Sequence, residues 1–185
     1  MAPPRTTLSD SDLYLFNEGT HYRLYEKMGA HLATEGGVAG ATFAVWAPNA
    51  ERVSVIGEWN GWDVARHTLA QRGASGIWEG FVPGVRRGDV YKYHIVSQHR
   101  GYWVDKADPF AAYAQTPPST GSVVWDRAYA WGDADWMRTR AARNALRAPV
   151  SIYEVHLGSW RRVAEEGNRS LGYRELAREL AEHVT

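Results

Sequence analysis

The sequence predicts a mainly β protein, in which an antiparallel β-sandwich is followed by a single strand and helix typical of a parallel sheet. Short runs of alternating apolar and polar residues, separated by turn residues, occupy positions 31 to 125. Strands at this spacing are typical of a sandwich. A strand that begins at Val150 has apolar residues on both faces, and an amphipathic helix pattern follows it. This pair predicts the opening of a second and larger domain.

The sandwich prediction depends on short alternating runs and on the turns between them. In the run 41–47, Phe43 and Val45 fall on one face, because successive residues of a strand point to opposite faces. The other runs are 53–59, 76–83, 91–96 and 122–125. The turns that bound the runs are Pro48-Asn49, Asn60-Gly61, Pro83-Gly84 and Gly88-Asp89.

Two segments without strand patterns flank the sandwich. In the N-terminal lead-in segment, residues 1–30, Ser9 and Asp12 are placed as a helix cap before an apolar run. Residues 126–149 form a linker that is predicted to be partly helical from 133 to 148. Pro149 ends the linker, because proline disfavours a helical conformation in the residue before it.

The C-terminal part, residues 150–185, is predicted as one strand and one helix. Residues 150–158 carry apolar side chains on both faces, which is typical of a strand covered on both sides. In the predicted helix 172–184, Leu176 and Leu180 recur at helical spacing, and Gly172 is a permissible N-cap with a glutamate three positions later. A parallel strand needs another strand beside it. We therefore expect further elements to complete this domain.

Composition excludes several classes of function. The formal net charge is zero and the isoelectric point is about 7.1, so neither nucleic acid nor a membrane surface is a predicted partner. There is no cysteine, which excludes disulfides and thiolate chemistry and fits a cytoplasmic location. The N-terminus lacks the apolar core of a signal peptide, and no apolar run is long enough to span a membrane.

The C-terminal residues resemble a known family. Ile152-Tyr-Glu-Val-His-Leu-Gly-Ser-Trp-Arg-Arg162, followed by Leu171-Gly-Tyr-Arg-Glu-Leu-Ala177, resembles the first barrel strand and first helix of 1,4-α-glucan (glycogen) branching enzymes. These enzymes belong to the α-amylase superfamily, glycoside hydrolase family 13. The Leu-Gly-Ser-Trp ending at 157–160 points to branching enzymes rather than to isoamylases or trehalose-releasing hydrolases.

The predicted sandwich resembles the α-glucan-binding module at the N-terminus of branching and debranching enzymes. The likeness starts from Phe43-Ala-Val-Trp-Ala-Pro48 and Val55-Ile-Gly-Glu-Trp-Asn-Gly-Trp-Asp63. It continues in Gly76-Ile-Trp-Glu79, Tyr91-Lys-Tyr93 and Lys106-Ala-Asp-Pro-Phe-Ala111. Together with the C-terminal match, the resemblance covers nearly the whole chain.

The resemblance implies a fold and a domain plan. The implied fold is an immunoglobulin-like antiparallel β-sandwich followed by the first strand and helix of an incomplete (β/α)8 barrel. The implied domains are the lead-in segment 1–30, the glucan-binding module 31–125, the linker 126–149 and the start of the catalytic barrel at 150–185. The rest of that barrel is then the expected packing partner.

The resemblance also implies a role in glycogen biosynthesis. A branching enzyme cuts an α-1,4-glucan chain and joins the fragment to a 6-hydroxyl, using one carboxylate as nucleophile and a second carboxyl as acid and base. In the family these groups lie on later barrel strands, so we assign no catalytic residue and expect this chain alone to be inactive. The chemistry requires no cofactor and no metal. Two alternatives stay open: a stand-alone, non-catalytic α-glucan-binding or interaction module, and the start of another α-amylase superfamily enzyme, debranching or trehalose-releasing.

Physical reasoning indicates which of the module's many aromatic residues could contact a glucan. Nine tryptophans and ten tyrosines suit either a carbohydrate-binding sandwich or a sandwich with an aromatic core. A glucose unit presents CH groups on one face and hydroxyls at its edges, so a site needs an exposed aromatic ring beside polar groups. Trp59 shares a strand face with apolar residues and is expected to pack inward, whereas Trp62 follows a turn and can project outward.

The predicted α-glucan contacts are Trp62, Lys92, Trp103 and Asn60. Lys92 points away from the face of Tyr91, and Asn60 belongs to the turn before Trp62. Trp103 stands where the family's stand-alone modules carry a stacking tryptophan. Burial of about 100 Å² of each tryptophan stabilises a complex by roughly 2.5 kcal/mol before costs, so binding should be weak and strengthened by multivalent attachment to a polymer. The alternative is a module that only packs against the barrel.

No other polar residues form a predicted site. His94 and His99 lack further ligands at a suitable spacing, so no metal site is predicted. Glu154 and His156 share one strand face, and we interpret both as structural because the family's catalytic groups come later.

Overall fold

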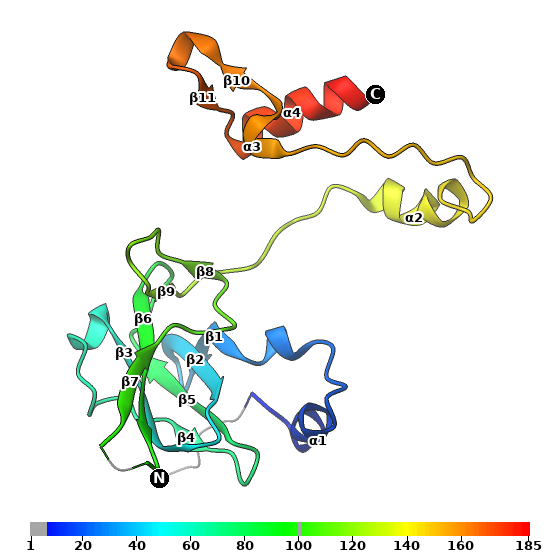
Figure 1. The fold of residues 1–185 in the computed structure, drawn as a ribbon. Coiled ribbons are helices and arrows are strands. Elements are labelled where there is room, and N and C mark those ends of the chain that lie inside the picture. The colour runs from blue at the N-terminus through cyan, green and yellow to red at the C-terminus, as the bar shows by residue number, and fades with distance from the viewer. Residues whose placement is uncertain (1–6, 100) are drawn as a thin grey trace. The chain divides into compact units, whose positions relative to one another are not determined.

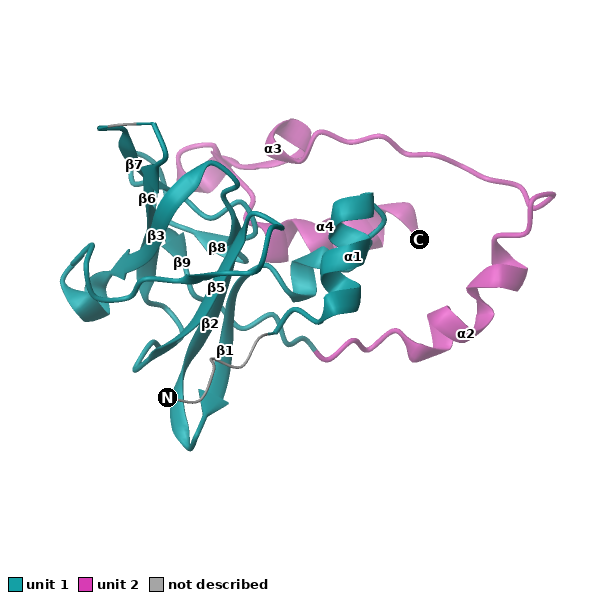
Figure 2. Ribbon diagram, turned by 90° about the horizontal axis from the view of Figure 1, so that it is seen from below, with its two compact units in different colours: residues 1–129 teal, residues 130–185 magenta. Residues whose placement is uncertain are grey.

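The computed structural model describes residues 7–99 and 101–185, and it is mainly β, with antiparallel sheets and short helices (Figure 1). The prediction of a mainly β, antiparallel protein is confirmed. The chain forms two compact units, residues 1–129 and 130–185 (Figure 2). Residues 1–6 of the lead-in segment lie outside the described residues. Within the described ranges, no helix is both long and apolar enough to cross a lipid bilayer.

The first sheet of unit 1, sheet A, carries the N-terminal strands. Its strands pair in the order β1 (Gly29–Glu35), β2 (Val38–Trp46), β5 (Ile77–Pro83) and β4 (Ala70–Gln71). All the pairings are antiparallel. β2 and β5 match two of the predicted alternating runs, whereas β1 and β4 were not predicted as separate strands.

The second sheet, sheet B, is built around the long strand β6. Its order is β3 (Ala50–Gly57), β6 (Val90–Ser97), β9 (Ser122–Val123) and β8 (Tyr113–Ala114), and β7 (Trp103–Lys106) also pairs with β6. The predicted run 53–59 ends earlier than expected, because residues from Glu58 to Asn60 form a 3₁₀ turn, η2. Gly61 follows with φ of 64°, a left-handed conformation that glycine adopts without strain.

The two sheets enclose one core. Phe43 of sheet A contacts Tyr91 of sheet B edge-on at 5.1 Å between ring centroids, and Tyr91 meets Tyr93 at 5.8 Å. Val53 and Val55 lie on the same inner face of sheet B as these tyrosines, because they pair with residues of equal parity on β6. The shared core makes unit 1 a two-layer sandwich.

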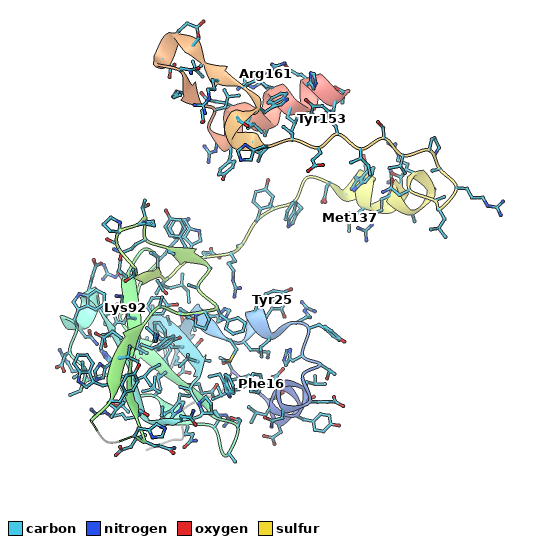
Figure 3. The ribbon with its side chains drawn as sticks, in the orientation of Figure 1. Phe16, Tyr25, Lys92, Met137, Tyr153 and Arg161 are labelled. Atoms are coloured by element: carbon cyan, nitrogen blue, oxygen red, sulfur yellow. The ribbon has the colours of Figure 1, made fainter. Side chains whose placement is uncertain are left out.

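A second apolar cluster covers the other face of sheet A. Its buried members are Leu8, Met28, Ala44 and Ile77, and the short helix α1 (Asp10–Glu18) packs on it through Phe16 (Figure 3). The predicted cap of this helix is confirmed. The Ser9 hydroxyl accepts from the Asp12 N–H at 3.2 Å, and the Asp12 carboxylate accepts from the Ser9 N–H at 2.8 Å.

The side chain of Arg72 fastens this N-terminal segment to the sandwich. Arg72 donates to the Leu8 carbonyl at 2.9 Å, and its guanidinium lies 3.2 Å from the Glu79 carboxylate. A 3₁₀ turn, η1 (Leu24–Glu26), then leads the chain into β1. The described part of the lead-in segment, from residue 7 onward, therefore packs as part of unit 1.

Unit 2 contains the helices α2 (Ala134–Arg143), α3 (Leu157–Trp160) and α4 (Tyr173–Val184). Between α3 and α4, the strands β10 (Arg162–Val163) and β11 (Arg169–Ser170) form a small hairpin around a 3₁₀ turn, η3 (Ala164–Glu166). The predicted N-terminus of α4 is confirmed, because the Gly172 N–H donates to the Glu175 carboxylate at 2.7 Å. The linker is partly helical, as predicted, through α2.

The structure does not confirm the predicted strand 150–158. Residues 151–156 have no regular secondary structure, and the segment from Leu157 to Trp160 is helical. Ile152 is 87% exposed. The physical reason is that the described residues offer no neighbouring strand to pair with it, and an unpaired strand gains no ladder hydrogen bonds.

Candidate functional site

The outer face of sheet B gathers the polar and aromatic residues that the sequence singles out. On β6, Tyr91 and Tyr93 point into the core, so Lys92 and His94 point outward by alternation. The antiparallel register places Trp103 opposite Val96 and Asp105 opposite His94. Directly opposed residues share a face of the sheet. Trp103 and Asp105 of β7 therefore stand beside His94 on the outer face.

A groove of about 530 Å³ crosses this face. We call it the β7 groove. It runs from the loop after η2, across β3 and β6, to β7. Its walls include Arg52, Val64, His94, Val96, Trp103 and Asp105.

Trp103 forms the exposed aromatic wall of the β7 groove. Its side chain is 60% exposed. Its ring lies 5.3 Å from the ring of His94, and His94 Nδ1 contacts an Asp105 carboxylate oxygen at 2.7 Å. His94 is buried, so the His94–Asp105 pair supports the inner side of Trp103 and leaves its outer side open. The half-exposed Asp105 carboxylate offers a hydrogen-bond acceptor at this groove. The Arg52 guanidinium offers donors at the same groove.

Lys92 lies on the same outer face but does not line the β7 groove. It is half-buried on β6 (Figure 3). Its Nζ donates to the Thr120 hydroxyl at 2.8 Å. Thr120 belongs to the loop between β8 and β9. Lys92 therefore joins that loop to the strand that carries His94, and its remaining N–H groups can donate further hydrogen bonds.

Trp62 projects from the loop after η2, as predicted. It is 40% exposed and adopts φ of 62°, which is uncommon for a residue with a side chain. Its N–H donates to the Gly57 carbonyl at 3.0 Å, which ties it to the end of β3. Val64, two residues later, lines the β7 groove. Trp59 packs inward, also as predicted, and stacks on Phe43 at 6.0 Å.

Asn60 lies inside this loop, and its predicted role needs correction. Only 6% of the residue is exposed. Its carbonyl oxygen accepts from the Gly57 N–H at 3.0 Å, and its amide nitrogen donates to the Val55 carbonyl at 3.1 Å and to His67 Nδ1 at 2.9 Å. These bonds occupy the amide within the protein. Asn60 thus shapes the loop that carries Trp62, and it does not face a ligand in this structure.

A buried carboxyl group holds the segment after β7. Asp108 accepts from the hydroxyls of Tyr91 at 2.6 Å and Tyr93 at 3.1 Å, and its own N–H donates to the Ser122 hydroxyl at 2.8 Å. Burial raises the pKa of Asp108, and the tyrosine and Phe110 N–H hydrogen bonds oppose that rise. The Lys106–Ala111 motif is therefore a structural anchor that fixes where β7 ends.

Several groove residues were not predicted from the sequence. The pairing of β6 with β3 and β7 brings Arg52 and Asp105 to the groove, and the course of the loop after η2 brings Val64 there. The sequence pattern specifies neither the pairing nor the course of the loop. Tyr102 also lines it. One signal was available: Trp103 and Asp105 alternate beside Gly101, a pattern typical of a short strand that returns along its neighbour.

The remaining sequence candidates form no site. Within residues 7–99 and 101–185, no cluster of three or more histidine, aspartate or glutamate side chains is arranged to hold a metal ion. His156 lies in unit 2, where its Nδ1 contacts the Ser159 hydroxyl at 2.7 Å. Glu154 is exposed in the irregular segment before it.

Part of the chain is similar to a known protein family. Residues 27–111 match carbohydrate-binding module 48, the isoamylase N-terminal domain. The structure of PulA from Klebsiella oxytoca aligns with 54% of this chain and 9% of its own, at 32% identity and a TM-score of 0.43.

Bacterial proteins named 1,4-alpha-glucan branching enzyme GlgB match nearly the whole chain. The relative from Albidiferax ferrireducens is 57% identical over 95% of this chain. Those from Paramagnetospirillum magneticum and Roseobacter denitrificans are 52% and 55% identical over 98% and 96% of it. The chain spans 24–27% of the length of these relatives and matches their N-terminal part.

Proposed function

We propose that this chain, homologous to the N-terminal part of GlgB branching enzymes, binds α-glucan chains on the outer face of sheet B. The observation that carries the proposal is the β7 groove, where an exposed tryptophan stands beside hydrogen-bonding side chains. The flat Trp103 ring suits the CH face of a glucose unit, and Arg52 and Asp105 suit its hydroxyls. The match to a carbohydrate-binding family supports the same ligand class.

Trp62 and Lys92 extend the proposed surface beyond the groove. Trp62 stands at the end of β3, in the loop that also supplies Val64 to the groove. Lys92 lies one outward position along β6 from His94. A glucan lying on Trp103 can therefore reach Lys92 and Trp62 at its edge. We retain these three residues as proposed contacts and assign Asn60 to shaping the loop.

The proposed binding is weak for a short oligosaccharide and stronger for a polymer. Stacking on one exposed tryptophan buries roughly 100 Å² of apolar surface, about 2.5 kcal/mol before entropic costs. A branched polymer presents many equivalent chains, so several modules can hold one particle and gain avidity.

We further propose that the longer protein carries out glucan chain transfer in the cytoplasm. The names of the relatives support a branching activity on 1,4-α-glucan. The family resemblance implies that this activity builds α-1,6 branches with retention of configuration. In that protein, residues 1–30 lead into the module at 31–125, residues 126–149 link the two domains, and residues 150–185 begin the catalytic (β/α)8 barrel. The irregular segment 151–156 becomes a strand there, because neighbouring barrel strands supply its hydrogen-bond partners.

Affinity electrophoresis in native gels that contain glycogen tests the binding proposal. We expect the 185-residue chain to be retarded, and Trp103→Ala and Trp62→Ala each to reduce the retardation. Loss of one stacking contact should weaken binding about fivefold to thirtyfold, which corresponds to about 1–2 kcal/mol.

Trp136→Ala is the matched control, because Trp136 is similarly exposed, at 45%, but lies in α2 of unit 2. It should leave the retardation unchanged. An unretarded wild-type chain, or folded Trp62 and Trp103 variants that migrate like wild type, would show that the module is a structural neighbour of the barrel instead.

A further inference from the structure

A second groove borders the β7 groove at Tyr102. It has a volume of about 340 Å³ and lies between the turn after β2 and the end of β6. We call it the Trp46 groove. Its lining includes Trp46, Pro48, Asn49, Ser97, His99 and Tyr102.

Tyr102 connects the two grooves. Its ring is exposed, and the residue lines both of them. Its backbone is fixed at the start of β7, because the Ser97 N–H donates to the Tyr102 carbonyl at 3.0 Å and the Tyr102 N–H donates to the His99 carbonyl at 3.2 Å. A chain that leaves the β7 groove past Trp103 therefore next meets an aromatic side chain on an anchored backbone.

Trp46 offers a supported aromatic ring in the second groove. It is 55% exposed at the end of β2. Phe16 of α1 contacts it edge-on at 6.1 Å between ring centroids. Its indole nitrogen also lies close to Gly76. A Cβ atom added to this glycine would lie 3.0 Å from that nitrogen. The ring is thus held on one side and open on the other, which lowers the entropy lost when a ligand stacks on it.

The chemistry of the Trp46 groove favours a neutral ligand. Its described lining residues include no aspartate, glutamate, lysine or arginine. Among the described lining residues only His99 could pair with an anion, so a phosphate or a nucleotide would find no permanently charged partner there. Aromatic walls beside asparagine and serine instead suit a sugar, which has apolar faces and neutral hydroxyl edges.

We infer that an α-glucan chain bound in the β7 groove continues across Tyr102 onto Trp46. This inference rests on the proposed function and deepens it, because it makes the module selective for longer chains. A short oligosaccharide fills one groove, whereas a longer one contacts both and gains the second stacking contact without a second loss of translational freedom.

Isothermal titration of the 185-residue chain with maltotriose and with maltoheptaose tests the inference. We expect wild type to bind maltoheptaose about fivefold to tenfold more tightly than maltotriose. Trp46→Ala should abolish most of this difference and leave maltotriose binding unchanged, whereas Trp103→Ala should weaken binding of both sugars. Tyr22→Ala, an exposed aromatic of unit 1 outside both grooves, is the control and should match wild type.

A second measurement covers the case in which Trp46→Ala does not fold. The indole N–H signal of Trp46, assigned with Trp46→Phe, should shift when maltoheptaose is added to wild type. A signal that does not move would overturn the inference.

The outcomes separate the two proposals. If wild type binds neither sugar, the proposed function fails and the inference falls with it. If wild type binds but a folded Trp46→Ala keeps the full preference for maltoheptaose, only the inference is overturned. It is also overturned if Trp46→Ala converts a dimer to a monomer with unchanged glucan affinity, since the groove would then be a protein interface.

Discussion

At the scale of single residues, the position of Trp62 depends on the side chain of Asn60. The buried Asn60 amide bonds to Gly57, Val55 and His67, and so closes the loop at the end of β3. Trp62 follows directly with a left-handed backbone, a conformation that costs free energy unless neighbouring contacts enforce it. Hydrogen bonds inside the loop therefore control where the exposed ring lies.

Asn60→Ala should lower the free energy of unfolding by about 1–3 kcal/mol, because it leaves the buried Gly57 N–H and the Val55 carbonyl without these partners. Urea denaturation measures the change. Asn17→Ala, at an exposed position of α1, is the matched control and should change stability by less than about 0.5 kcal/mol. Equal effects of the two substitutions would contradict the role assigned to Asn60.

The same loop should respond to pH through His67. Burial lowers the pKa of His67 below its ordinary value of 6.5, and the charge of Arg66 lowers it further. The neutral ring accepts from the Asn60 amide at Nδ1, and a proton there would remove this acceptor. Because the folded pKa is depressed, the stabilisation is present above about 6.5 and is lost as pH falls through the lower folded value.

On lowering the pH from 7.5 to 5, we therefore expect the free energy of unfolding of wild type to fall relative to that of His67→Ala. Urea midpoints at a series of pH values measure both proteins. Burial also lowers the pKa of His31 and raises the pKa values of Asp108 and Glu79. These three groups are present in both proteins, so their contributions cancel in the comparison. Identical pH profiles would show that His67 does not couple the loop to pH.

Sequence patterns predict the orientation of a side chain where the local backbone conformation alone determines it. Alternation places Lys92 outward and Trp59 inward, and the turn signal places Trp62 at the surface, all as the structure has them. The burial of Asn60 was not predictable, because a turn asparagine can face either solvent or backbone. Asp105 and Arg52 reach the groove only through the pairing of β6 with β7 and β3, which no local pattern specifies.

At the scale of elements, predictions succeeded where a strand alternates and has a partner in the chain. β2, β3, β5 and β6 are such strands. β7 and β8 are short, at 4 and 2 residues, and carry too few alternations to be recognised alone. The segment 150–158 has a strand pattern but no partner among the described residues. A strand is stabilised by its neighbours, so sequence pattern alone does not decide whether it forms.

Hydrogen exchange tests this account of the elements. We expect slow exchange in the paired strands between residues 41 and 97, and fast exchange at residues 151–156, which have no regular structure. α4 should also exchange quickly, because a helix of 12 residues with one buried side chain is marginal in water. Slow exchange throughout 150–184 in a monomer would contradict it.

At the scale of the whole molecule, the chain corresponds to 24–27% of the length of its GlgB relatives. The family resemblance assigns the catalytic carboxylates to later barrel strands, and a retaining transfer needs both of them on either side of the scissile bond. We therefore propose that the glucan-binding surface and the catalytic groups of the longer protein lie in different parts of its chain.

The 185-residue chain should accordingly show no branching or hydrolytic activity on amylose. The iodine spectrum and the number of reducing ends measure the two activities. The full-length relative from Albidiferax ferrireducens serves as the positive control. Reproducible new α-1,6 linkages made by the short chain would refute the assignment of catalysis to later strands.

The most direct test of the central claim, that α-glucan binds on the outer face of sheet B, is an NMR titration of the ¹⁵N-labelled 185-residue chain with maltoheptaose. The claim predicts shifts of the backbone amide signals of Arg52, of residues 94–96 and of residues 102–105. It also predicts shifts of the indole N–H signals of Trp62 and Trp103. The amide signals of α1 and of unit 2 should not change. A spectrum that does not change at millimolar sugar, or shifts confined to unit 2, would contradict it.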